Sequence, residues 1–305
     1  MEISELEDAL NVVQSSVSKI KWKLKPAAKR RLRIDILALC TGLRPVVMID
    51  YGGKMPELQE RLCTVLQLTQ KESLFLQPLR VMVIEDMIYL IHVRGLAEYV
   101  ESSLNSETKI LFVNLQQDPP KMVIQTEQNL VATELKEIQK FFLSVFPVDG
   151  TNKGLLPCAR KDHLVDEKSP VGGVITSQSS EFIDLSDCMQ DVHVTVPTLN
   201  GWLLGYPVVY LFDRDHIADA TYNLSTKSLH LFKVSVCRNG ISGEGSHLEE
   251  LMSFSVPYDL STEGKNESWA QDFRAQMLIR FEKCKQAWRY LQMDVSECYP
   301  QAIVL

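Results

Sequence analysis

The sequence predicts a mixed α+β protein in which helices flank a central mixed sheet. Apolar residues recur at the helical spacing of three and four near both ends of the chain, and short apolar runs between turn residues predict strands. The 305 residues are 45% hydrophobic and 23% charged, which is typical of a globular protein. A chain of this length buries a full core without disulfides, and because its seven cysteines form no C-x-x-C pair, we expect reduced thiols.

Two helices are predicted at the start of the chain. Alternating spacings of three and four predict the first helix over residues 3–24. Pro26 favours the first turn of a second helix over residues 26–40, and Gly42 suits the end of that helix. The stripe of the first helix consists of Ile3, Leu6, Leu10, Val13, Val17, Ile20 and Leu24.

Strands and helices then alternate up to residue 146. Only Glu85 and Asp86 separate two apolar runs, so we expect these runs to pair as a hairpin. The predicted strands cover residues 45–49, 79–84, 87–93 and 109–115, and the predicted helices cover residues 56–68, 95–105 and 127–146.

Residues 147–186 differ in character from both flanks. They are rich in glycine, proline, serine and charge, and they show no apolar periodicity, which is typical of a flexible insertion or linker. This stretch separates residues 1–146, with the N-terminal helices and a first α/β half, from residues 187–305. We expect the second half to pack with the first as one unit.

The second half is predicted to contain a short helix, three strands, one long helix and a possible last strand over residues 301–305. The short helix covers residues 199–204, and the strands cover residues 207–212, 228–236 and 250–256. The long helix covers residues 267–293, because an apolar stripe follows helical spacing there. Its members are Phe273, Met277, Phe281, Cys284, Trp288 and Leu291.

The two halves share a local pattern. Residues 42–50 resemble residues 205–213, since in both a strand with Pro-Val-Val follows a glycine and ends in aspartate. Two strands, a helix and a last strand then follow each copy, although the first copy adds a helix after its first strand. This order is consistent with two similar β-β-β-α-β halves. The alternative is chance, because α/β chains commonly repeat their elements.

The candidate catalytic residues are Asp50, Asp213, Asp215 and His216. Ligands of open α/β sheets bind outside the carboxyl ends of strands, where we expect Asp50 and Asp213. An apolar strand followed by Asp-x-Asp resembles phosphotransferases in which the first aspartate attacks phosphorus and Mg²⁺ assists. Ile217 stands where that pattern favours Thr or Val, and no later acidic pair follows a strand. Turn-forming or helix-capping carboxylates are therefore the alternative.

A basic stretch offers a different kind of site. Residues 19–33 contain eight cations and no acid, and residues 26–33 resemble short nuclear-import signals. Basic runs also attract acidic partners. A solvated helix face is the alternative, because Leu32 and Ile36 belong to a predicted core stripe. The candidate import or partner-binding residues are Lys29, Arg30, Arg31 and Arg33.

Two segments resemble an uncharacterised vertebrate family of unknown function. They are residues 42–52, with Gly-Leu-Arg-Pro at the start and Asp-Tyr-Gly at the end, and residues 200–208, Asn-Gly-Trp-Leu-Leu-Gly-Tyr-Pro-Val. The resemblance extends over most of the chain outside residues 147–186. It implies no known catalytic residue and no cofactor.

The leading functional hypothesis is a soluble intracellular protein, cytoplasmic or also nuclear, that is non-catalytic and acts through contacts with a protein partner. The alternative is a small-ligand-binding protein or a metal-assisted hydrolase or transferase that uses Asp50 and Asp213. A net charge of -7 argues against nucleic acid. No apolar run reaches the roughly 18 residues of a membrane span, and the acidic N-terminus has no secretory pattern. No residue pattern predicts a cofactor, a metal site or an oligomeric state.

Overall fold

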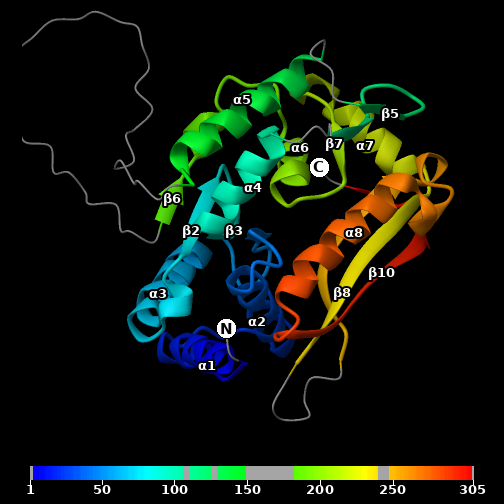
Figure 1. Cartoon of the computed structure of the whole chain (residues 1–305). Helices are drawn as coiled ribbons and strands as arrows, with labels where there is room; N and C mark the ends of the chain where they lie inside the picture. Colours follow the sequence, from blue (N-terminus) through cyan, green and yellow to red (C-terminus); the bar gives the residue numbers. More distant parts are fainter. Residues whose placement is uncertain (1–2, 106–109, 125–128, 149–181, 240–246, 304–305) are drawn as a thin grey trace, which may run out of the picture.

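The computed structural model describes residues 3–105, 110–124, 129–148, 182–239 and 247–303. It confirms the mixed α+β class (Figure 1). The described strands form three separate sheets rather than one central sheet. Short 3-10 helices connect the main elements at Leu74–Leu76, Ser186–Met189, Arg214–His216, Tyr258–Leu260 and Gly264–Asn266.

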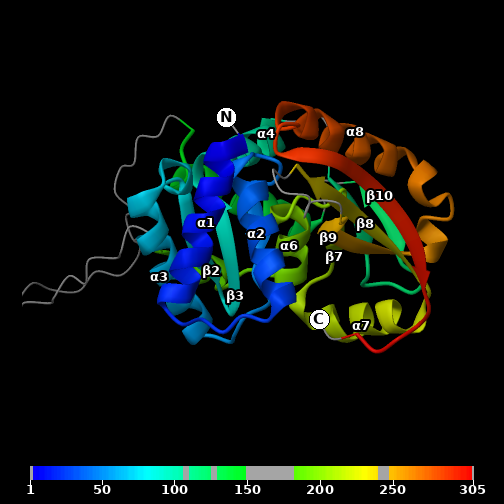
Figure 2. The same cartoon turned by 90° about the horizontal axis from the view of Figure 1, so that it is seen from below.

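The N-terminal helices cover one face of the first sheet (Figure 2). They are α1 (Ile3–Lys19), α2 (Pro26–Cys40) and α3 (Glu57–Glu72). The bounds of α2 agree with the prediction, whereas α1 ends five residues before Leu24. The chain turns there because Lys21 adopts a positive φ of 57°. Trp22 then leaves the helical stripe, and its Nε1 donates a hydrogen bond to the Gly52 backbone oxygen at 2.8 Å.

The first sheet has the order β1-β3-β2-β6. Its strands are β1 (Val46–Met48), β2 (Leu79–Ile84), β3 (Met87–His92) and β6 (Phe182–Asp184). The predicted hairpin is confirmed, with β2 antiparallel to β3. β6 corrects the predicted bounds of the insertion, because it pairs in parallel with β2. Residues 149–181 of that stretch lie outside the described residues.

The other face of the first sheet packs against a second helical layer. Side chains alternate between the faces, so Val81 and Leu90 contact the N-terminal layer while Met82 and Tyr89 contact the other. The second layer contains α4 (Val93–Asn105), α5 (Leu130–Val145) and α6 (Val196–Leu203).

The second sheet joins the two predicted halves of the chain. Its strands are β4 (Leu111–Asn114), β5 (Lys121–Ile124) and β7 (Val208–Leu211), in the order β5-β4-β7. β7 lies parallel to β4, with Leu111 opposite Val208. Neither β5 nor α7 (Ile217–Thr226) is predicted by the sequence pattern, because both are short and lack a clear apolar period.

The third sheet has the order β10-β8-β9, and α8 (Ser268–Lys283) packs against it. Its strands are β8 (Leu229–Arg238), β9 (Glu249–Pro257) and β10 (Trp288–Cys298). The predicted helix over residues 267–293 is therefore wrong beyond Lys283. Trp288 opens a strand whose ladder with β8 runs from Arg238 to Leu229, and this long-range pairing outweighs the local helical spacing.

The two halves share their order of elements but differ in how the strands pair. From α2 to β4 and from α6 to β10 the order is α-β-α-β-β-α-β. Gly42 and Gly205 both adopt positive φ, 72° and 74°, directly after α2 and α6. β1, however, is antiparallel to β3 within its own half, whereas β7 is parallel to β4 of the other half.

Candidate functional site

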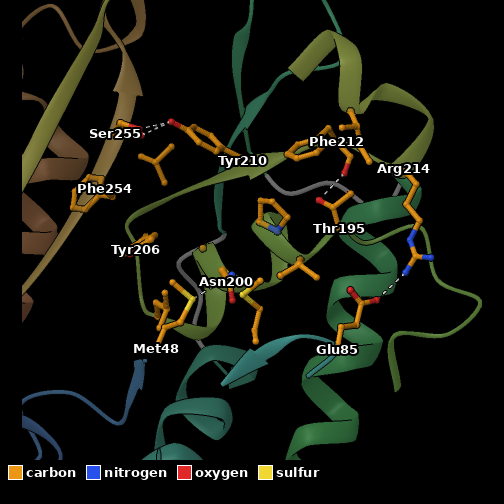
Figure 3. A pocket seen from close by; sticks show the side chains of 17 residues that line it. Met48, Glu85, Thr195, Asn200, Tyr206, Tyr210, Phe212, Arg214, Phe254 and Ser255 are labelled. Atoms are coloured by element: carbon orange, nitrogen blue, oxygen red, sulfur yellow. Dashed lines mark hydrogen bonds and ion pairs between the residues drawn. The ribbon is translucent and has the colours of Figure 1, made fainter. Parts of the chain in front are cut away.

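A pocket of about 680 Å³ lies where the three sheets meet (Figure 3). The first sheet contributes Met48 and Met87, β7 of the second contributes Val208 and Tyr210, and β9 of the third contributes Phe254 and Ser255. Its volume falls in the range of about 300–1,000 Å³ that is common for small-molecule sites. Most of the lining is apolar or aromatic, as such sites require.

The helix α6 forms one wall because a glycine lets it approach β7. A Cβ at Gly201 would lie 2.9 Å from Val209 Cγ1 and 3.3 Å from Val209 Cα, so a larger residue would push the helix away. The helix also covers the free edge of β7. The Thr198 hydroxyl donates to the Tyr210 backbone oxygen at 2.8 Å, and the Thr195 hydroxyl donates to that of Phe212 at 3.3 Å.

Several polar side chains line the pocket, and Tyr210 and Arg214 are held by neighbouring groups. The Tyr210 hydroxyl donates to the Ser255 backbone oxygen at 2.8 Å. At the rim, one Arg214 nitrogen lies 3.2 Å from Glu85 Oε1 and 3.1 Å from the Met189 backbone oxygen. Figure 3 shows the contact of Tyr210 with Ser255 and the contact of Arg214 with Glu85.

The described ionisable side chains that line the pocket are two tyrosines and one ion pair. Burial raises the pKa of Tyr210 to about 12 and also raises the pKa of Tyr206, so both phenols stay neutral near pH 7. Glu85 is the one carboxylate among the described lining residues, and it is paired with Arg214. The described lining thus combines apolar side chains and neutral polar groups with one ion pair at the rim.

The four predicted catalytic residues do not line this pocket. Asp50 and Asp215 are exposed, and Asp50 follows β1 while Asp213 follows β7 of another sheet. Asp213 caps the 3-10 helix Arg214–His216: its Oδ1 accepts from the backbone N–H groups of Asp215 and His216, and lies 2.6 Å from His216 Nδ1. Its Oδ2 accepts from Gln116 Nε2 at 3.0 Å.

A second histidine lies near this cap. His193 Nδ1 is 2.8 Å from Glu134 Oε1, and the His193 backbone N–H donates to Glu134 Oε2. The hydrogen bond and charge of Glu134 raise the pKa of His193, and Asp213 and Asp215 add to this effect. The sequence gives no signal for this contact, because α5 and residue 193 are separated along the chain by residues 149–181.

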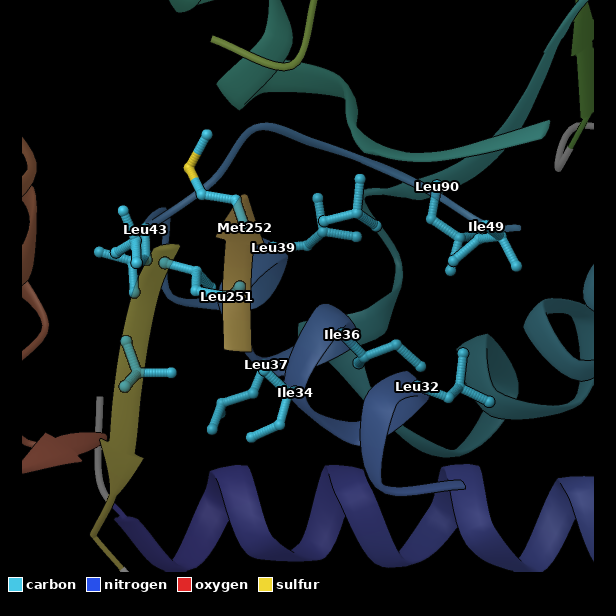
Figure 4. Packing of buried hydrophobic residues seen from close by; sticks show 14 of the residues in the cluster. Leu32, Ile34, Ile36, Leu37, Leu39, Leu43, Ile49, Leu90, Leu251 and Met252 are labelled. Atoms are coloured by element: carbon cyan, nitrogen blue, oxygen red, sulfur yellow. The ribbon is translucent and has the colours of Figure 1, made fainter. Parts of the chain in front are cut away.

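The predicted basic site is partly built into the fold. Arg31 lies 3.1 Å from Asp35 Oδ2 and donates to the backbone oxygens of Glu250 and Leu251 at 2.6 and 3.2 Å. Figure 4 shows Leu251 and Met252 of β9 beside the apolar side chains of α2. Of the other three candidates, Arg30 lies 3.6 Å from Glu249, Arg33 lies 4.0 Å from Glu7, and Lys29 is exposed.

Asp35 is a buried carboxyl group at the centre of this contact. Its side chain is 0% exposed, and Tyr51 donates a hydrogen bond to its Oδ2 at 2.7 Å. Burial raises the pKa of Asp35, while Arg31, Tyr51 and Arg44 oppose that rise. Arg44 also donates to the Leu251 backbone oxygen at 2.9 Å. The network thus ties α2 to the free edge of β9.

No group of three or more histidine, cysteine, aspartate or glutamate side chains within the described ranges could hold a metal ion. In the same part of the chain, no helix combines the length and apolar composition that a membrane span requires.

The fold and the pocket define a mixed α+β protein with a ligand-sized site. Residues 14–305 match the model of a family described as "Domain of unknown function (DUF4504)", so the chain belongs to this family. This agrees with the resemblance to a family of unknown function. No curated protein and no solved structure matches the chain. Both segments on which the resemblance rests reach the pocket, through Met48 in the first and through Asn200, Gly201, Leu204, Tyr206 and Val208 in the second.

Proposed function

We propose that the protein is a non-catalytic binding protein whose ligand is a small, mostly apolar molecule held in the pocket between the three sheets. The observation that carries this proposal is the pocket itself, about 680 Å³ in volume and lined largely by methionine, leucine, valine and aromatic side chains. Burial of apolar surface in such a site is the main source of binding free energy.

The polar groups of the pocket support binding rather than catalysis. General acid–base catalysis needs a group that titrates near the working pH. Tyr206 and Tyr210 hold their protons, and Glu85 forms an ion pair with Arg214 at the rim. These groups orient a ligand without exchanging protons with it.

The metal-assisted hydrolase or transferase has less support. It would use Asp50 and Asp213, which follow strands of different sheets and do not line the pocket. Asp213 already accepts hydrogen bonds at both oxygens, which suits a helix cap. A nucleophilic aspartate needs a free oxygen that faces its substrate.

A protein partner, the leading hypothesis from the sequence, also has weaker support. Among the residues that the structure describes, the most exposed apolar side chains belong to separate elements: Leu74 follows α3, Ile279 is on α8 and Tyr299 follows β10. Single exposed apolar residues are normal on protein surfaces. Nuclear import would need an accessible basic segment, and Arg31 is engaged by Asp35 and β9.

A titration with the apolar fluorophore Nile red tests the proposed function. Ile217 lines the pocket and is 42% exposed, so Ile217→Trp narrows the site without burying a large side chain in the core. Ile279→Trp on α8 is the matched control, at an isoleucine that is 61% exposed and does not line the pocket. We expect one saturable site in the wild type and in Ile279→Trp, weakened at least about tenfold in Ile217→Trp. No saturable binding, or equal binding by both variants, would overturn the proposal.

A further inference from the structure

We infer that the ligand carries a neutral carbonyl-type oxygen next to its apolar part, and that this oxygen accepts a hydrogen bond from the side-chain amide of Asn200. This inference rests on the proposed function, because it assigns the chemistry of the same pocket. Asn200 lies on α6, and Figure 3 shows it beside Met48 among the lining side chains.

Two neighbours fix the orientation of the Asn200 amide. The Tyr89 hydroxyl bonds to Oδ1, and Nδ2 lies 3.9 Å from Met48 Sδ. A hydroxyl can donate or accept, but a thioether only accepts, and does so weakly. The NH₂ group must therefore face Met48, and Tyr89 must be the donor to Oδ1.

Tyr89 holds this orientation before any ligand arrives. Tyr89 lies in β3 and is 0% exposed. Burial raises the pKa of its phenol, so the hydroxyl keeps the proton that it donates. Tyr89 already donates to the Asn200 oxygen, whereas the amide hydrogens have only the Met48 thioether nearby, so the less satisfied group that the side chain offers the pocket is the donor. A donor held in place by a buried partner needs little ordering when a ligand binds.

The surroundings of Asn200 select the kind of acceptor. Met48, Met87, Pro197 and Leu204 line the same pocket, so a hydrocarbon placed there would leave the amide hydrogens with only a thioether as partner. A carboxylate would lack a cation, since Arg214, the one cationic lining residue described, is paired with Glu85 at the rim. A ketone, ester or amide oxygen satisfies the donor without adding charge.

Two probes of nearly equal shape test this inference. Acetophenone carries a carbonyl oxygen where α-methylstyrene carries a methylene group. We would measure both dissociation constants by titrations monitored by NMR. We expect the wild type to bind acetophenone about threefold to tenfold more tightly, the effect of one hydrogen bond. In Asn200→Ala this preference should fall to about one, while α-methylstyrene still binds.

Two tyrosine variants separate the role of orientation from general stability. Tyr89→Phe removes the hydroxyl that orients Asn200, so the preference for acetophenone should fall there as well. Tyr99→Phe is the matched control, because the Tyr99 hydroxyl also bonds to α6, at the Trp202 backbone oxygen, without contacting Asn200. It should keep the wild-type preference.

The outcomes distinguish this inference from the proposed function. Equal binding of the two probes by the wild type would overturn the carbonyl inference and leave the binding function in place. A preference that persists in Asn200→Ala would do the same. Failure of both probes to bind, together with no saturable Nile red site, would overturn both.

Discussion

The Tyr210 hydroxyl donates a hydrogen bond to the backbone oxygen of Ser255 at 2.8 Å, and this bond joins the edges of two sheets. Tyr210 lies on β7 and Ser255 on β9, each an edge strand of its sheet. Edge strands expose unpaired backbone groups that can pair with other chains. Here side chains cover them, with Arg31 and Arg44 bonded to β9 and Thr198 bonded to β7. The two edges therefore form pocket walls without pairing directly.

Tyr210→Phe should lower the free energy of unfolding by about 0.5–1.5 kcal/mol, because it removes one hydrogen bond and leaves the Ser255 oxygen without this donor. Urea denaturation measures the change. Ser255→Ala is the control, since it keeps the backbone acceptor and loses only the hydroxyl contact. Equal stability of Tyr210→Phe and the wild type would show that the bond between the edges contributes nothing.

Trp288→Ala should be strongly destabilising, by about 3–5 kcal/mol, because it leaves a cavity in the core. The Trp288 residue is 1% exposed at the start of β10, and its Nε1 donates to Thr41 Oγ1 at 3.1 Å. Tyr290→Ala on the same strand is the control, as Tyr290 is 51% exposed and should cost about 1 kcal/mol or less. Similar midpoints of chemical denaturation for both variants would refute the buried position of Trp288.

Trp288 also shows how far the sequence alone leads. Its burial followed from apolar spacing, but its secondary structure did not, because the pairing of β10 with β8 depends on residues 50 to 69 positions away. The bounds of α2 were predictable since Pro26 and Gly42 mark its ends locally. The strand ending before Asp213 was predictable for the same reason.

The pocket was not predictable, because no local pattern marks it. Its walls come from β1, β3, α6, β7 and β9, which meet only through long-range contacts such as the parallel pairing of β4 with β7. Asn200 and Tyr89 are 111 residues apart, and neither stands in a motif with known chemistry. The carboxylates at strand ends were the predicted site residues instead, because their position after a strand can be read from the sequence.

Arg31→Met should lower the free energy of unfolding by about 2–3 kcal/mol, because it deprives the buried Asp35 of a cationic partner and the Glu250 backbone oxygen of its side-chain donor, while the Leu251 oxygen keeps only Arg44. This expected loss of unfolding free energy is smaller than the loss for a fully buried ion pair, because the Arg31 side chain is 29% exposed. Arg30→Met is the neighbouring control, because the exposed Arg30–Glu249 pair is worth about 0.5 kcal/mol. If both variants unfold at the same urea concentration, Arg31 is only a surface cation.

The contact between Asp213 and His216 should make stability depend on pH. The hydrogen bond from His216 to Asp213 raises the pKa of His216. The stability that this contact adds is fully present below about pH 6.5 and is lost as the pH rises through the folded-state pKa of His216. Partial burial acts to raise the pKa of Asp213, but His216 and two backbone N–H groups lower it overall. That contribution is present above about pH 4 and is lost as pH falls through the folded-state value.

Comparison with His216→Ala isolates this effect. The difference in unfolding free energy between wild type and variant should be largest between about pH 4 and 6.5, and should shrink on both sides. Its size should stay below about 1 kcal/mol, because the pair is open to water. Denaturation at several pH values gives the profile, and a difference that grows above about pH 7 would contradict the assignment.

The central claim is that the pocket between the three sheets accepts a ligand, and methionine-methyl NMR tests it most directly. Met48 and Met87 line the pocket, whereas Met277 on α8 and Met293 on β10 are buried elsewhere. With methyl-labelled methionine and saturating acetophenone, we expect the Met48 and Met87 signals to shift while those of Met277 and Met293 stay in place. Unchanged Met48 and Met87 signals, or equal shifts at all four methyl groups, would contradict the account.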